Sequence, residues 1–207
     1  MYTLLTHRTL VKDGYYHVFN RGNGKQEIFH DDEDYQYFLS ILAECLQPQV
    51  QKRNGYMRKN YHELIQITSF TLMPNHMHMS IKQCDELSLS DFLQSVSIRY
   101  SKYRNKKYDL VGHTFQDRFK ARLIEGDEDL INVSAYIHCN PRDLNLDIFN
   151  YPYSSLQFYV NPHLTPPWMH IEDVSQIFKS FYGLGKKDWS VEYKKYIDER
   201  PHEISEI

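Results

Sequence analysis

The sequence predicts an α+β fold in which helices pack on a mainly antiparallel sheet, most nearly a ferredoxin-like sandwich. Segments with strand and helix patterns follow one another in the order strand, helix, two strands, helix, strand, helix. The two middle strands are neighbours in the chain, which is typical of an antiparallel hairpin. Hydrophobic residues make up 41% and charged residues 25% of the 207 positions, an ordinary composition for a globular protein with a core.

The first strand is expected in GYYHVFNRG (14–22), where aromatic and β-branched residues lie between two glycines. It runs into the turn sequence Asn-Arg-Gly-Asn-Gly. A helix should follow, because Asp31 is a good N-cap and further acidic residues occupy the first turn. Pro48 marks the end of this helix, whose apolar positions are Tyr35, Phe38, Leu39, Leu42 and Leu46.

A strand pair is expected next, after a polar and basic connector at 51–60. ELIQITSFTLM (63–73) forms the first strand, and the turn-forming pair Pro74-Asn75 leads into the second. Side chains alternate between the two faces of a strand, so the residues after this turn divide into two sets. Met77, Met79 and Ile81 can fill the core, whereas the opposite face carries His76, His78 and Ser80.

A second, amphipathic helix begins at Ser88, with Arg99, Lys102 and Lys106 off its apolar stripe. The stripe consists of Leu89, Phe92, Leu93, Val96, Tyr100 and Tyr103. A half-exposed strand is expected within 113–126, because its side chains alternate and Gly126 ends it. One set is Phe115, Asp117 and Phe119, and the other is Gln116, Arg118 and Lys120.

A short helix is expected between Asp127 and Pro141, and a proline-bearing link follows at 161–168. Two more helices are expected at about 171–183 and 190–199. The chain is therefore predicted to have one main domain at 1–160 and a helical C-terminal extension at 161–207 that packs on it.

Composition excludes some classes of protein. No apolar run approaches the roughly 18 residues of a membrane span, and the N-terminal residues lack the pattern of a secretion signal. The three cysteines form no C-x-x-C pair, which favours reduced thiols in the cytoplasm. The net charge is −3, yet residues 99–122 hold eight basic and two acidic side chains. This stretch can form a phosphate-binding face or an ordinary solvated surface.

His76 and His78 could hold one divalent ion, because residues at i and i+2 of a strand have backbones only about 7 Å apart. Two surface histidines are the simpler explanation of this short pattern. On the helix at 127–141, Tyr136 and Asn140 are i and i+4, so a phenol and an amide share a face. A tyrosine can attack a phosphodiester when a metal withdraws charge from the phosphate. However, Tyr136 is one of 17 tyrosines, most of which should serve packing.

Five ordered motifs resemble those of REP-associated tyrosine transposases, relatives of the single-tyrosine HUH transposases of insertion sequences. They are VFNRGNGKQEIFHDDEDYQYFL, MPNHMHMSI, GHTFQDRFKARLI, AYIHCNP and YPYSS, within about residues 12–160. The resemblance implies that His76 and His78 bind the metal, that Asn140 is the third protein ligand and that Tyr136 is the nucleophile. It also implies that the loop containing Asn20 and Arg21 and the segment containing Gln116, Arg118 and Lys120 lie near DNA.

The implied activity is metal-dependent nicking and rejoining of single-stranded DNA at hairpin-forming repeats, through a 5′-phosphotyrosine intermediate. Mg²⁺ or Mn²⁺ is the expected ion. Expected phosphate contacts are Arg99, Lys102, Lys106, Arg118 and Lys120. The protein should act on palindromic repeats in the cytoplasm, associated with the nucleoid, as a monomer or homodimer. A non-catalytic module that binds structured nucleic acid remains the alternative. A metal-free two-histidine phosphoesterase is set aside, because only one H-x-S element is present.

Overall fold

The computed structural model describes residues 10–48 and 59–201. The connector predicted at 51–60 lies, apart from its last two residues, outside the described part of the chain. Among the described residues, the helices are too short or too polar to cross a membrane.

Four strands form one sheet in the spatial order β2-β3-β1-β4, and all neighbours are antiparallel. The strands are β1 (Gly14–Arg21), β2 (Ile65–Met73), β3 (His76–Gln83) and β4 (Lys120–Leu123). β2 and β3 form the predicted hairpin across Pro74-Asn75. The order and orientation are those of a ferredoxin-like sheet, so the predicted fold class is confirmed.

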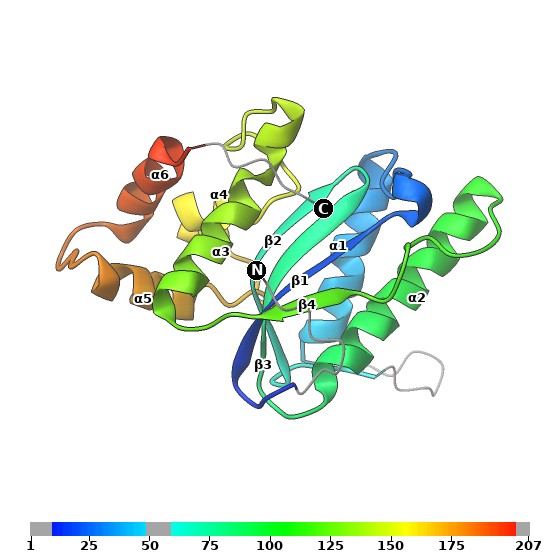
Figure 1. Cartoon of the computed structure of the whole chain (residues 1–207), viewed down its shortest axis with the longest axis horizontal. Helices are drawn as coiled ribbons and strands as arrows, with labels where there is room; N and C mark the ends of the chain where they lie inside the picture. Colours follow the sequence, from blue (N-terminus) through cyan, green and yellow to red (C-terminus); the bar gives the residue numbers. More distant parts are fainter. Residues whose placement is uncertain (1–9, 49–58, 202–207) are drawn as a thin grey trace.

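Two helices, α1 (Asp32–Leu46) and α2 (Ser88–Tyr108), lie to the right of the strands in Figure 1 and pack against each other. Asp31 caps α1 as predicted, accepting a hydrogen bond from the backbone N–H of Asp34 at 3.1 Å. Tyr100 is fully buried and donates to the carbonyl of Ile28. The apolar stripe of α2 therefore belongs to the core, and Tyr100 serves packing.

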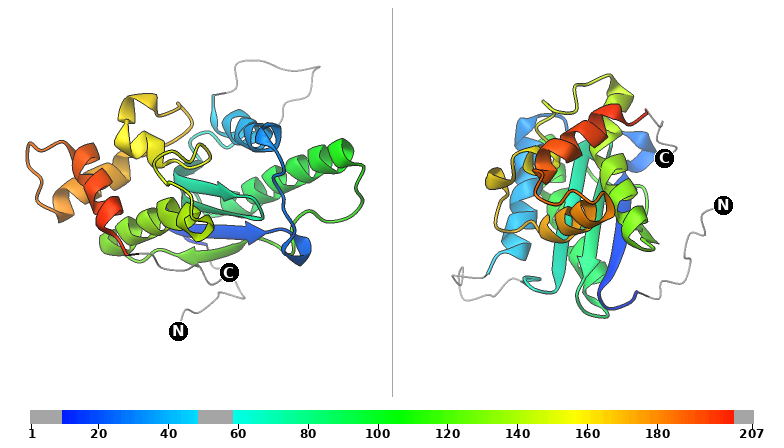
Figure 2. Two further views of the ribbon diagram at one scale, coloured as in Figure 1. Left: turned by 90° about the horizontal axis from the view of Figure 1, so that it is seen from above. Right: turned by 90° about the vertical axis from the view of Figure 1, so that its left-hand side faces the viewer.

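The remaining α-helices lie on the other side of the strands (Figures 1 and 2). The longest of them is α3 (Asp127–Cys139), which packs on β2 and β3. It continues into a 3-10 turn, η2 (Asn140–Leu144). The other segments are α4 (Leu156–Val160), η3 (Pro162–Leu164), α5 (Glu172–Phe181) and α6 (Trp189–Glu199), and a further 3-10 turn, η1 (Asn23–Lys25), follows β1.

The last helix, α6, is attached to α3 and η2 by polar contacts, and α5 packs on α3. His138 on α3 is fully buried, with Nδ1 2.9 Å from the hydroxyl of Tyr193 on α6 and Nε2 2.8 Å from Oγ of Ser155. Burial lowers the pKa of His138 to about 3, so this imidazole is neutral. Arg142 donates to the carbonyls of Ile197 and Arg200 at the end of α6. The tail thus holds α3 from its outer side.

The strand predicted across 113–126 is much shorter than expected, since only Lys120–Leu123 pair with β1. Residues 112–119 form a loop, in which Phe115 and Phe119 are buried and Asp117 is exposed. The side chain of Asn20 donates to the carbonyl of Asp117 at 3.1 Å, and the backbone N–H of Gln116 donates to the carbonyl of Arg21 at 3.0 Å, so the loop is tied to the end of β1. The alternation of aromatic residues therefore reflects loop residues anchored in the core.

Candidate active site and nucleic-acid interface

The two histidines of the H-x-H pattern lie at the start of β3, on the face that α3 covers. His78 is 1% exposed, and His76 is partly buried beside the turn. Their rings are 5.2 Å apart and perpendicular. The intervening Met77 is 1% exposed and belongs to the core. The predicted division of β3 into a polar face and a core face is confirmed.

Tyr136 and Asn140 both project from α3 toward these histidines. The ring of Tyr136 lies 5.5 Å from that of His78, edge to face. Oδ1 of Asn140 lies 3.2 Å from Nε2 of His76. A following proline disfavours helical angles, yet Asn140 keeps φ −49° and ψ −38°. The helix therefore carries both side chains to one place, together with His76 and His78.

The hydrogen bonds around His76 indicate where a cation would fit. Nδ1 of His76 lies 2.6 Å from Oδ1 of Asn75, and its Nε2 faces the amide oxygen of Asn140. The amide nitrogen of Asn140 donates to the carbonyl of Tyr136, which sets the orientation of this amide. A neutral imidazole has only one N–H, so it cannot donate to both oxygens. When the proton is on Nδ1 of His76, the lone pair of its Nε2 and a lone pair of Oδ1 of Asn140 face each other. Two ligands of one metal ion have this arrangement.

His78 has a ring nitrogen that is free to bind a cation. Nε2 of His78 is buried and has no hydrogen-bond partner among the described residues. Burial lowers the pKa of His76, and burial with the neighbouring histidines lowers that of His78 further. Both rings are therefore neutral, the form that binds metals. Two imidazoles and an amide oxygen suit Mn²⁺ and are compatible with Mg²⁺, although the described residues hold no cluster of three His, Cys, Asp or Glu side chains.

One residue of this site, His17, is not predicted from the sequence. His17 on β1 is 9% exposed, and its Nε2 lies 2.9 Å from Nδ1 of His78. Its ring also lies 5.6 Å from that of Tyr136. Burial lowers its pKa to about 4. The sequence shows only that His17 lies on one face of a predicted strand. The pairing of β1 with β3 must be known before His17 can be placed beside His78.

The predicted DNA-contacting residues of β1 and the following segments lie together next to the histidines. Arg21 pairs with His76 in the sheet register, and its Nε donates to the side-chain oxygen of Gln116 at 2.5 Å. Lys120 lies with its Nζ 5.8 Å from the ring centre of Phe19. A small hollow lies among these side chains. It is lined by Phe19, Asn20, Arg21, Gln116, Asp117 and Lys120.

A larger groove of about 930 Å³ runs between α2 and the loop at 112–119. Its lining combines apolar surface with amides and hydroxyls, and its charged side chains are those of Lys102, Arg118 and Asp117. Asn20, Gln116 and Asp117 line both this groove and the small hollow, so the two are adjacent. The groove therefore offers amides, hydroxyls and two cations along one path toward β1.

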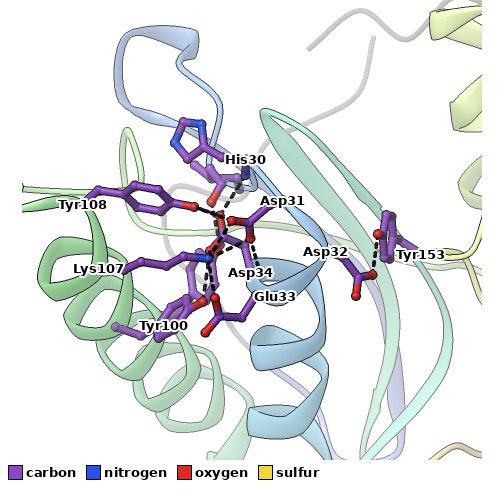
Figure 3. Close-up of polar contacts among 11 residues, drawn as sticks. His30, Asp31, Asp32, Glu33, Asp34, Tyr100, Lys107, Tyr108 and Tyr153 are labelled. Atoms are coloured by element: carbon purple, nitrogen blue, oxygen red, sulfur yellow. Dashed lines mark hydrogen bonds and ion pairs between the residues drawn. The ribbon is translucent and has the colours of Figure 1, made fainter.

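Half of the basic side chains in 99–122 are engaged inside the fold. Arg99 pairs with Glu44 at 2.6 Å, Arg122 with Asp129 at 2.7 Å, and Arg104 donates to the carbonyl of Glu27. Lys107 contacts three acidic residues at the start of α1, as Figure 3 shows for Asp31, Glu33 and Asp34. No ion pair within the described ranges involves the other four: Lys102, Lys106, Arg118 and Lys120.

Comparisons with known proteins agree with this fold. A family described as "Transposase IS200 like" matches residues 10–140, the segment that contains both histidines, the tyrosine and the asparagine. A solved structure of a REP-associated tyrosine transposase bound to a REP hairpin is similar, with a TM-score of 0.56 and 19% identity, covering 81% of this chain and 91% of that chain. A comparison with curated proteins finds no match.

The fold and the family match define a transposase-type DNA-processing protein. The chain belongs to the IS200-like transposase family, since the match spans well over half of its residues.

Proposed function

We propose that this protein nicks and rejoins single-stranded DNA at hairpin-forming repeats, in a metal-dependent reaction with Tyr136 as nucleophile. One observation carries the proposal: His76, His78 and Asn140 converge beside Tyr136, where the buried Nε2 of His78 has no hydrogen-bond partner in the described part of the chain. The similar solved structure holds a REP hairpin, which supports a hairpin as the substrate.

In the proposed reaction, the phenol of Tyr136 loses its proton and its oxygen attacks the scissile phosphorus. The bond from phosphorus to the 3′ oxygen breaks, and that oxygen leaves as a 3′-hydroxyl after taking up a proton. The DNA stays linked through its 5′ phosphate to Tyr136, so a second 3′-hydroxyl can reverse the step and join strands. A Mg²⁺ or Mn²⁺ ion held by His76, His78 and Asn140 would polarise the phosphate.

The other groups bind and orient the strand. Lys102, Arg118 and Lys120 provide positive charge along the groove and the hollow for backbone phosphates. The uncharged amides and hydroxyls of the groove suit unpaired bases beside a hairpin. Arg99 is paired with Glu44 and is therefore a weaker candidate for phosphate binding than the other expected contacts.

The experiment uses the purified chain, Mg²⁺ or Mn²⁺, and a labelled DNA hairpin with a single-stranded flank. The wild type should cut the flank and form a covalent adduct, and Tyr136→Phe should form none while still binding the hairpin. Tyr182→Phe is the matched control, because Tyr182 is an exposed tyrosine just after α5. Undiminished cutting by Tyr136→Phe would refute the assignment.

Metal dependence is tested with the double variant His76→Ala, His78→Ala. Cleavage should vanish in this variant, while binding of the hairpin in the absence of metal should remain. A wild type that binds the hairpin tightly but never forms an adduct with either ion would instead identify a non-catalytic binding module.

A further inference from the structure

His17 lies between the two chemical parts of the candidate site. It belongs to β1, where its register partner on β3 is Ser80, two residues from His78. Its ring lies nearly parallel to that of His78, at an interplanar angle of 24° and with ring centres 5.1 Å apart, and the two rings meet at their nitrogen edges. The same ring makes an edge-to-face contact with Tyr136, with ring centres 5.6 Å apart. His17 therefore contacts both a candidate metal ligand and the candidate nucleophile.

The contact between the two histidines determines which nitrogen of His78 can bind an ion. Nε2 of His17 and Nδ1 of His78 are 2.9 Å apart, so one of the two carries the shared proton. If His78 donates from Nδ1, its Nε2 keeps a lone pair. If His17 donates, the neutral ring of His78 must carry its proton on Nε2, a buried atom without an acceptor among the described residues.

The first arrangement is the one that a metal site uses. A metal-ligating histidine commonly donates its other N–H to a neighbouring acceptor, which fixes both the tautomer and the orientation of the ring. His76 already has such a neighbour, since its Nδ1 faces the amide oxygen of Asn75. His17 offers His78 the equivalent acceptor, with the difference that the acceptor is itself an imidazole nitrogen.

We propose that His17 is a positioning residue that accepts a hydrogen bond from Nδ1 of His78 and so presents Nε2 of His78 to a divalent cation. The inference rests on the proposed function, because it assumes that His78 is a ligand. It adds that β1, which contributes no ligand, sets the metal affinity of the site.

The tautomer can be measured without any metal. In the ¹⁵N–¹H NMR spectrum of the metal-free protein labelled at histidine, the signals missing in His78→Ala identify His78. The wild type should show the Nδ1–H tautomer of His78 near neutral pH. A His78 ring protonated on Nε2 would overturn the inference.

Metal affinity provides the second test, by calorimetric titration with Mn²⁺. His17→Phe keeps a ring of similar size but removes the acceptor, and it should weaken Mn²⁺ binding about 10- to 100-fold. His17→Gln places an amide oxygen near the position of Nε2 and should restore part of the affinity. His163→Phe, at an exposed histidine in η3, is the matched control and should bind as the wild type does.

The outcomes separate this inference from the proposed function. If His78→Ala loses Mn²⁺ binding but His17→Phe keeps wild-type affinity, the role of His17 is refuted and the metal site stands. If neither the wild type nor His78→Ala binds Mn²⁺, the metal site and the inference both fail. Melting temperature and metal-free binding of the hairpin report whether each variant is folded. Weak Mn²⁺ binding by a folded His17→Phe, restored by His17→Gln, supports the inference.

Discussion

Nε2 of His76 lies 3.2 Å from Oδ1 of Asn140, although 64 positions separate the two residues in the chain. The contact joins the start of β3 to the end of α3 and requires α3 to remain helical up to Pro141. It therefore links the geometry of the site to the packing of α3 on the sheet. The position of Asn140 can be tested directly by exchanging its side chain.

Asn140→Ala should lower metal-dependent cleavage at least about tenfold, because it removes the only oxygen ligand proposed from the protein. Asn140→Asp keeps an oxygen at the same position and should retain much more activity. The measurement is adduct formation as a function of Mn²⁺ concentration. Equal loss in both variants would point to a role for the amide N–H, which bonds the carbonyl of Tyr136.

Arg118→Gln and Lys120→Gln should weaken binding to the flanked hairpin and reduce its salt dependence. Each lost phosphate contact lowers the slope of log affinity against log salt by about 0.7 for single-stranded DNA. Lys195→Gln is the control, since Lys195 lies exposed on α6 in the tail. Fluorescence anisotropy over a salt series makes the measurement. An unchanged slope in Arg118→Gln and Lys120→Gln would place the DNA elsewhere.

Asp34→Asn should destabilise the protein by about 3–5 kcal/mol at pH 7, because it removes a buried charge and leaves its partners unmatched. The side chain of Asp34 has no exposed area and accepts from the hydroxyl of Tyr103. It also accepts from the backbone of His30, from Lys107 and from the hydroxyl of Tyr108 (Figure 3). Glu33→Gln is the control, because Glu33 also contacts Lys107 but is largely exposed, and it should change stability little.

The pH dependence of this effect has a definite sign. Burial alone would raise the pKa of Asp34, but the hydrogen bonds from His30, Lys107 and the tyrosines outweigh it and hold the pKa below its ordinary value. A carboxyl with a lowered folded-state pKa contributes stability above its unfolded pKa of about 3.9 and loses it as pH falls further. Urea unfolding should therefore show the gap between wild type and Asp34→Asn narrowing below about pH 4. A constant gap would contradict the lowered pKa.

Tyr193→Ala should destabilise the protein by about 3–5 kcal/mol, because it empties a fully buried aromatic site and leaves His138 without one partner. Val191→Ala on the same helix is the control, since Val191 is 62% exposed and should change stability by less than about 0.5 kcal/mol. Thermal and urea unfolding give the values. A small effect of Tyr193→Ala would mean that α6 adds little to the main body of the protein.

Local sequence patterns predicted most of the fold. The alternation of His76, Met77 and His78 placed the histidines on one face because the strand repeat is two residues. The helical repeat placed Tyr136 and Asn140 on one face, because residues four positions apart are neighbours on a helix surface. The prediction of a strand at 113–126 was wrong over most of that range. Phe115 and Phe119 alternate with polar residues as in a strand, but they belong to a loop and are buried in the core.

The sequence by itself determined which side chains share a face of each element, and its ordered motifs indicated the family. Only the tertiary structure decided which of those faces meet. It engaged Arg99 and Lys107 in ion pairs with α1, and it brought His17 against His78. The physical reason is that periodicity is a property of neighbouring residues, whereas these contacts depend on the pairing of β1 with β3 and on the packing of helices against the sheet.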